Sequence, residues 1–73
     1  MAELTDKEVA TRFTYHPPNA SQLPRYQLLR RSGLELASII NRLCPSSRET
    51  ALAFTRLEEA IMWANAAIAR RES

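Results

Sequence analysis

Apolar residues recur at helical spacing in two long stretches of the chain. In residues 46–71 the intervals alternate between three and four positions, at Phe54, Leu57, Ile61, Ala64 and Ile68. Such intervals place the apolar residues along one face of an α-helix. Because a helix of this length extends about 37 Å at ~1.5 Å per residue, a second long element is expected to lie along it.

Residues 21–43 carry the same alternation, at Tyr26, Leu29, Gly33, Leu36, Ile40 and Leu43. Only the short linker Cys44-Pro45-Ser46 separates the two stretches, so they are predicted to pack as an antiparallel helical hairpin. Gly33 lies in mid-helix, where glycine costs about 1 kcal/mol relative to alanine, and this indicates a close approach of the opposite helix. The small residues expected to supply that neighbour are Ala60, Ala64 and Ala67.

Local signals mark where these two helices begin and end. Ser46 and Glu49 have the spacing of a capping box, which predicts that the second helix begins at Ser46. Pro45 disfavours helical backbone angles at Cys44, so the preceding helix should end there. Ser21 is the expected cap of that preceding helix, which has a proline in its first turn.

The N-terminal part of the chain is predicted to start with a short helix. Thr5 and Glu8 repeat the capping-box pattern, which places this helix over residues 5–12. Because so short a helix is marginal in isolation, it should dock through apolar side chains. The available groups are Leu4, Val9 and Phe13.

The next segment, residues 13–18, reads Phe-Thr-Tyr-His-Pro-Pro. Two consecutive prolines favour an extended and stiff backbone. Alternation along an extended segment puts Phe13 and Tyr15 on one side and His16 on the other. Either aromatic could fill a gap in the core. Tyrosine also suits a half-buried ligand site, because one end of its side chain is polar.

The chain of 73 residues has room for one domain, predicted to be all-helical over residues 1–73. A domain of this size is marginal alone, and a single cysteine, Cys44, cannot build a disulfide framework. Oligomerisation is the remaining common way to stabilise it. Leu28, Leu34 and Ile39 lie off the main apolar stripe, which we interpret as contact with another protomer. No signal peptide or membrane span is evident, and a free cysteine suits a reducing cytoplasm.

The sequence offers little support for catalysis. Cys44 could act as a nucleophile with His16 as its base, but nothing places the two side chains together. Glu58 and Glu59 are adjacent on a helix, so they diverge instead of forming a carboxylate pair. A single glycine cannot form a phosphate-binding loop, and a lone histidine does not make a metal site. We therefore expect no enzyme, no metal site and no cofactor.

The basic residues favour binding. The chain has nine arginines and one lysine, with a net charge of +2. An aromatic plane beside guanidinium groups can capture a nucleobase together with its phosphate, and Tyr15, His16 and Arg30 supply such groups. Polymeric nucleic acid would need a larger positive balance and a continuous basic track, so a small phosphate ligand is favoured. A helical oligomeric adaptor and a nucleic-acid-binding protein remain alternative interpretations.

Other polar and aromatic residues of the C-terminal helix have structural interpretations. Arg70 and Arg71 suit the negative end of the helix dipole. Asn65, within an apolar run, is interpreted as a buried partner for backbone groups or as a register device. Met62 and Trp63 are typical of a core or an interface.

Four segments of the chain carry a family resemblance, namely residues 12–18, 24–30, 44–49 and 57–70. The most specific parts are R-F-T-Y-H-P-P over residues 12–18 and W-A-N-A-A-I-A-R over residues 63–70. Together these segments resemble the anti-CBASS cyclic-nucleotide sponges, a family of small helical proteins from tailed phages. The resemblance covers the chain from about Arg12 onward.

The resemblance implies a homohexamer of helical hairpins that binds its ligands without hydrolysing them. It implies capture of cyclic dinucleotides such as cGAMP between paired protomers. It also implies capture of cyclic trinucleotides, such as cyclic triadenylate, where three protomers meet. Sequestration of these signals in the cytoplasm of the infected bacterium would keep the CBASS effector inactive. No membrane and no polymeric nucleic acid are expected as partners.

The resemblance also implies roles for individual residues. Tyr15 resembles the aromatic residue that stacks on a base of the dinucleotide, and Arg30 the cationic residue at its phosphates. Ser32 falls near a hydroxyl position of the trinucleotide site. The C-terminal arginine of that site corresponds to Arg70 or Arg71. Phe13 and His16 are expected as pocket walls by proximity.

Overall fold

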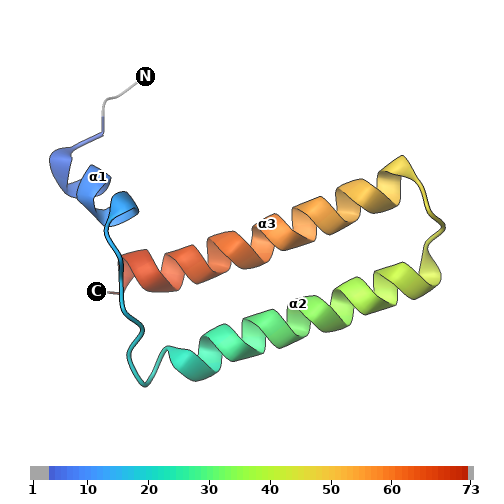
Figure 1. Ribbon diagram of the computed structural model, residues 1–73, viewed down its shortest axis with the longest axis horizontal. Coiled ribbons are helices and arrows are strands. Elements are labelled where there is room, and N and C mark those ends of the chain that lie inside the picture. The colour runs from blue at the N-terminus through green and yellow to red at the C-terminus, as the bar shows by residue number, and fades with distance from the viewer. Residues whose placement is uncertain (1–3, 73) are drawn as a thin grey trace.

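The computed structural model describes residues 4–72, which form three helices and no strand. They are α1 (Asp6–Phe13), α2 (Leu23–Leu43) and α3 (Arg48–Arg71). The helices α2 and α3 run antiparallel side by side, and α1 lies at the end of the hairpin where α2 begins and α3 ends (Figure 1). The predicted all-helical hairpin is confirmed, and each helix begins one or two residues later than the sequence indicated.

The N-terminus of α3 corrects one predicted cap. Ser47, not Ser46, is the capping residue, and its hydroxyl accepts a hydrogen bond from the Thr50 amide at 3.1 Å. The Thr50 hydroxyl donates in turn to the Pro45 carbonyl at 2.7 Å. This bond closes the turn between α2 and α3 and favours the cap one residue later. The predicted end of α2 is correct, because Cys44 is extended at φ −111° and ψ 139°.

The start of α2 differs more from the prediction. Ser21 does not cap the helix: Gln22 occupies the capping position and makes no side-chain cap bond. Instead, the Asn19 side chain accepts hydrogen bonds from the Gln22 amide and the Ser21 hydroxyl. The turn before α2 is therefore organised by Asn19.

Polar contacts, not apolar ones, hold α1 to the rest of the chain. Thr5 caps it as predicted, with its hydroxyl accepting from the Glu8 amide at 3.1 Å. The three apolar groups predicted to dock it are exposed, Phe13 most of all at 83%. An ion pair at 2.9 Å joins Glu8 to Arg71 at the end of α3. The docking prediction was wrong because α1 lies beside the end of the hairpin and does not cover its apolar seam (Figure 1).

The seam between α2 and α3 is tightest at Gly33. A Cβ on Gly33 would lie 2.9 Å from Cγ1 of Ile61, so the close approach predicted here is present. The neighbour is this large side chain and not one of the alanines of α3. One helical turn further along, Ala37 is half-buried, whereas Leu36, predicted to lie in the seam, is 46% exposed.

The molecule is one helix thick and has almost no interior of its own. It measures 45 × 36 × 13 Å, and a helix with its side chains is about 10–12 Å across. Within residues 4–72 no apolar side chain is buried. An apolar groove of about 240 Å³ runs beside the seam, with Leu34, Ala37 and Phe54 among its walls. None of the described helices combines the length and the apolar character needed to cross a membrane.

Candidate functional site

A groove at the open end of the hairpin gathers residues from three parts of the chain. It has a volume of about 410 Å³ and lies where the segment before α2 meets the first turns of α2 and the last turns of α3. We call it the first groove. Its lining residues are His16, Pro18, Tyr26, Arg30, Asn65, Ala66, Ala69 and Arg70.

His16 is held in place by a hydrogen bond to the end of α1. Its Nε2–H donates to the Thr11 carbonyl at 2.7 Å. Two prolines follow it, so the backbone on that side is also restricted. The histidine is thus a positioned wall of the groove.

The cationic part of the first groove comes from both long helices. Tyr26 and Arg30 are four residues apart on α2, so they share a helix face, as do Ala66 and Arg70 on α3. Neither Arg30 nor Arg70 forms an ion pair with a carboxylate of residues 4–72. Their guanidinium groups are therefore available to an anionic ligand, and a planar fork of donors suits phosphate.

Asn65 adds an unsatisfied polar atom to the first groove. Its Oδ1 is buried and accepts no hydrogen bond from the described residues. It does not serve through this atom as a partner for backbone groups, which was one sequence-based interpretation. A buried acceptor without a partner is costly.

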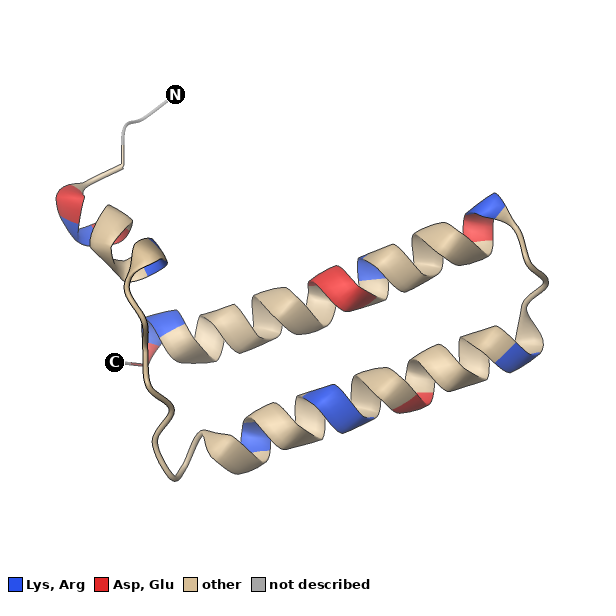
Figure 2. Ribbon diagram, in the orientation of Figure 1, with Lys and Arg blue, Asp and Glu red and all other residues tan. Residues whose placement is uncertain are grey.

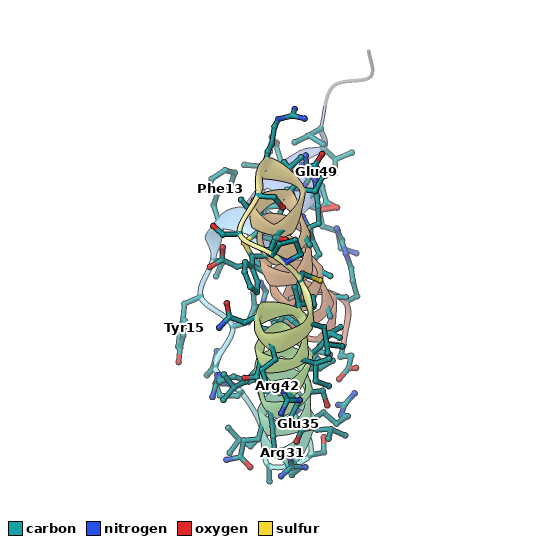
Figure 3. All side chains as sticks on the ribbon, turned by 90° about the vertical axis from the view of Figure 1, so that its right-hand side faces the viewer. Phe13, Tyr15, Arg31, Glu35, Arg42 and Glu49 are labelled. Atoms are coloured by element: carbon teal, nitrogen blue, oxygen red, sulfur yellow. The ribbon has the colours of Figure 1, made fainter. Side chains whose placement is uncertain are left out.

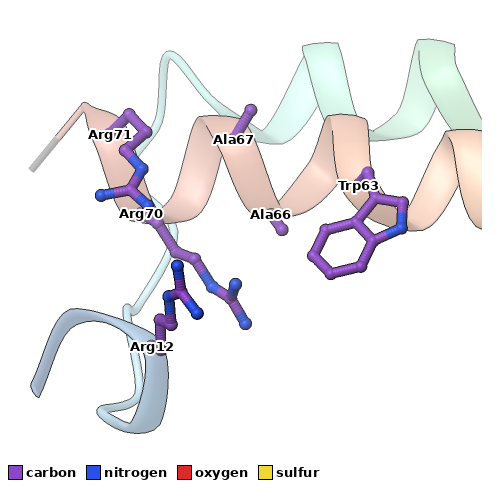
Figure 4. Close-up of a pocket in the computed structure, with 6 residues that line it drawn as sticks. All are labelled: Arg12, Trp63, Ala66, Ala67, Arg70 and Arg71. Atoms are coloured by element: carbon purple, nitrogen blue, oxygen red, sulfur yellow. The ribbon is translucent and has the colours of Figure 1, made fainter. Parts of the chain in front are cut away.

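A second groove, of about 300 Å³, lies on the neighbouring face of α3. Its lining residues are Arg12, Trp63, Ala66, Ala67, Arg70 and Arg71 (Figure 4). The two grooves share Arg70 and Ala66. Figure 2 shows the basic end of α3 beside α1, next to a long uncharged stretch of the same helix.

Glu8 distinguishes the two C-terminal arginines. Its carboxylate lies 2.9 Å from Arg71 and only 3.6 Å from Arg12. The hydrogen bond from Arg71 is the main reason that the pKa of Glu8 is lowered from its usual value. Arg71 is thus engaged within the protomer, whereas Arg70 lines both grooves.

The structure brings three of the residues suggested by the sequence, namely His16, Arg30 and Arg70, into the first groove. Tyr15 is 80% exposed, projects away from the helices and lines neither groove (Figure 3). Phe13 and Ser32 are also exposed and lie outside both grooves.

Sequence reasoning did not single out two walls of the first groove, Tyr26 and Asn65. The four-residue interval between Tyr26 and Arg30 was a usable signal, because it places the ring and the guanidinium on one helix face. The apolar run around Asn65 did indicate that its side chain is buried, but it gave no sign that Asn65 lines a groove.

The arrangement suits binding of an anionic, base-bearing ligand. Guanidinium groups, an imidazole and a tyrosine surround the first groove, and such groups hold phosphates and stack on bases. No cluster of three potential metal-ligating side chains occurs in residues 4–72. His16 and Cys44 flank opposite ends of α2, so they do not form a nucleophile–base pair.

Comparison with known proteins gives one family. The family model described as Acb2/Tad1, hairpin domain, matches residues 5–69. Neither the curated proteins nor the solved structures include a match to the chain.

Proposed function

The chain belongs to the Acb2/Tad1 family of anti-CBASS sponges, which bind cyclic oligonucleotides, and we propose from this that it sequesters cyclic dinucleotides of the cGAMP type. The family match confirms the resemblance drawn from the sequence and covers all three helices except the last residues of α3. Binding would be stoichiometric capture without hydrolysis. It would act in the cytoplasm of a phage-infected bacterium and keep the CBASS effector without its signal.

The observation that carries this proposal is the first groove. Arg30 and Arg70 reach it from two helices without carboxylate partners among residues 4–72, so two phosphates can each receive a guanidinium. His16 offers a positioned imidazole, which can bond to the edge of a base. A compact ligand with two phosphates and two bases matches this set of groups.

Tyr15 would complete the site from a neighbouring protomer. Its ring is 80% exposed and projects away from its own hairpin (Figure 3). So exposed an aromatic side chain is free to contact a ligand or a second protomer. We propose that it stacks on a base bound across a pair of protomers, where stacking contributes about 1–3 kcal/mol per base.

We further propose that the protomers assemble into a homohexamer. The single-layer hairpin buries no apolar side chain within residues 4–72, and a chain of this size is marginal alone. Assembly would cover the exposed apolar residues of both long helices.

Cyclic trinucleotides, such as cyclic triadenylate, are proposed as further ligands where three protomers meet. Ser32 is exposed on α2 and free to take part. Of the two C-terminal arginines, Arg70 is the better candidate for the ligand contact, because Arg71 is paired with Glu8.

Calorimetric titration with 3′,3′-cGAMP tests the proposal. Saturable binding with fewer than one ligand per chain is expected, because the site lies between protomers. Chromatography of the ligand released by heat should recover it chemically intact. Failure to bind both 3′,3′-cGAMP and cyclic triadenylate would contradict the proposal and favour a helical adaptor.

A further inference from the structure

The second groove brings Arg70 together with Trp63 and Arg12, two residues that the proposed function does not use. Trp63, Ala67 and Arg70 follow one face of α3, separated by four and three residues. Trp63 and Arg70 are thus seven residues apart, about 10 Å along the helix axis at ~1.5 Å per residue. The alanines between them leave open space at the floor of the groove (Figure 4).

The aromatic end of this groove is accessible. Trp63 is 58% exposed, and its indole stands at the end of the groove opposite the arginines (Figure 4). An indole face in this position can stack on a nucleobase, and such stacking tolerates any base because every base has a π-face.

The cationic end carries an excess of two positive charges. Three guanidinium groups, from Arg12, Arg70 and Arg71, line the groove, and one carboxylate, Glu8, contacts them. Glu8 is closer to Arg71 at 2.9 Å than to Arg12 at 3.6 Å. Arg12 and Arg70 therefore keep most of their capacity to bind an anion, and both extend into the space beside α1 (Figure 4).

The positive charge of this end favours phosphate ligands that carry more negative charge. A phosphate monoester carries about −1.5 to −2 at pH 7 and presents three acceptor oxygens, which matches two guanidinium groups. A phosphodiester, as found in cyclic nucleotides, carries a single negative charge. The cationic end therefore favours a terminal phosphate over the bridging phosphates of a cyclic oligonucleotide.

We propose that the second groove binds a nucleoside 5′-monophosphate, with its base on Trp63 and its phosphate between Arg12 and Arg70. This site adjoins the first groove and shares Arg70 and Ala66 with it, whereas Trp63 and Arg12 line the second groove and not the first. Its volume of about 300 Å³ is at the lower end of the ~300–1,000 Å³ typical of small-molecule pockets, which suits a mononucleotide.

Trp63 is the single tryptophan of the chain, so its fluorescence reports directly on the groove. Titration of the full-length protein with 5′-AMP should quench this emission saturably. Two matched probes separate the parts of the ligand: 3′,5′-cyclic AMP keeps the base but has a diester, and adenosine has no phosphate. Each should bind at least about tenfold more weakly than 5′-AMP, since a charge-assisted hydrogen bond is lost.

Single substitutions test which side chains bind the phosphate and the base. Arg12→Gln should weaken 5′-AMP binding about tenfold, because it removes one of the two guanidinium groups. Arg31→Gln is the matched control on an exposed part of α2, outside both grooves, and should leave the affinity unchanged. Trp63→Phe, followed by calorimetry, should retain part of the affinity, whereas Trp63→Ala should lose at least about fivefold.

Three results would overturn the proposal. They are no saturable quenching by 5′-AMP, equal affinity for 5′-AMP and 3′,5′-cyclic AMP, and equal effects of Arg12→Gln and Arg31→Gln. A Trp63→Phe variant of lower oligomeric mass, together with an unquenchable wild-type signal, would identify the indole as an interface group. Titration of Arg12→Gln with 3′,3′-cGAMP separates this site from the proposed sponge function, because that binding should be unchanged.

Discussion

Gln22 is the one buried polar side chain among residues 4–72, with 5% of its surface exposed. Its Oε1 accepts from the Asn19 amide at 3.1 Å, and its Nε2 donates to the Ile68 carbonyl and to Glu72, each at 3.3 Å. One side chain therefore links the turn before α2 to the last turn of α3.

Replacement of this side chain should loosen the open end of the hairpin. Gln22→Ala leaves polar backbone groups without partners, so we expect a loss of about 1–3 kcal/mol in the free energy of unfolding. Thermal and denaturant unfolding at equal protomer concentration measure the change. Gln27→Ala, on an exposed part of α2, is the control, and equal effects of the two substitutions would contradict this role of Gln22.

The ion pair between Arg25 and Glu72 predicts a pH dependence. Hydrogen bonds from Arg25, and then from Gln22, lower the pKa of Glu72 from 4.5 to about 2. Because the carboxylate form is favoured in the folded state, its contribution to stability is complete above about pH 4.5. The contribution is lost as the pH falls from there to about 2.

Melting temperatures of the wild type and Glu72→Gln, measured between pH 7 and pH 2, test this dependence. The wild type should be the more stable at pH 7, and the difference should disappear toward pH 2. Glu35→Gln is the control, because Glu35 forms no ion pair within residues 4–72. A difference that stayed constant over the whole range would exclude the ion pair as its source.

Substitution of Tyr15 tests whether this residue contacts the ligand or packs within the protein. Since its ring is 80% exposed, Tyr15→Ala should leave the stability and the oligomeric mass unchanged. It should weaken binding of 3′,3′-cGAMP at least fivefold, because stacking contributes about 1–3 kcal/mol per base. Calorimetry and sedimentation measure the two properties. A collapse of the oligomer would instead make Tyr15 an interface residue, and Tyr15→Phe should retain binding if stacking is its role.

At the scale of the elements, the tight contact between α2 and α3 predicts that Gly33→Ala destabilises the hairpin, although the same substitution would stabilise an isolated helix. In isolation, Gly33→Ala should stabilise α2 by about 1 kcal/mol. In the hairpin the new Cβ would lie 2.9 Å and 3.2 Å from two carbons of Ile61, so a net loss of about 1–3 kcal/mol is expected. Ile61→Ala removes both carbons, and in that background Gly33→Ala should become stabilising.

A double-mutant cycle on Gly33 and Ile61 measures this coupling directly. Thermal unfolding of the wild type, both single variants and the double variant, at equal protomer concentration, provides the four values. Additive effects would mean that the two helices can move apart at no cost. In that event the close approach would not explain why a glycine occupies this position.

The helices themselves could be predicted because periodicity and local signals are encoded within each segment. Their starts were less certain: Ser46 and Ser47 are adjacent, and each is followed three residues later by a side chain suited to the first turn. The Thr50 hydroxyl, which bonds to the Pro45 carbonyl, favours the second position. The sequence could not reveal this bond, because it depends on the path of the turn.

The first groove was only partly predictable for the same reason. The sequence identified His16, Arg30 and Arg70 separately by residue type or by resemblance. Their meeting depends on the segment before α2 crossing the end of α3, which no local pattern encodes (Figure 1). The exposure of Phe13 was missed likewise, because docking of α1 by ion pairs is a tertiary property.

At the scale of the whole molecule, the exposed apolar side chains favour burial against other protomers. Leu34 is 68% exposed beside the apolar groove along the seam, and Leu43 and Met62 are also more than half exposed. Burial of a leucine side chain contributes about 1.5–3 kcal/mol relative to exposure. Repeated over several protomers, such contacts can stabilise a hairpin that has no core of its own.

Leu34→Glu should therefore dissociate the proposed assembly. A carboxylate at this position would have to be desolvated on association, and burial of an unpaired charge costs several kcal/mol. Sedimentation should show a shift from an oligomer to the mass of one protomer, with a loss of helicity because the isolated hairpin is marginal. Gln27→Glu adds the same charge to an exposed position of α2 and should leave the mass unchanged. If Leu34→Glu kept the wild-type mass, the apolar groove would lie outside the protomer interface, and the proposed hexamer would need another contact surface.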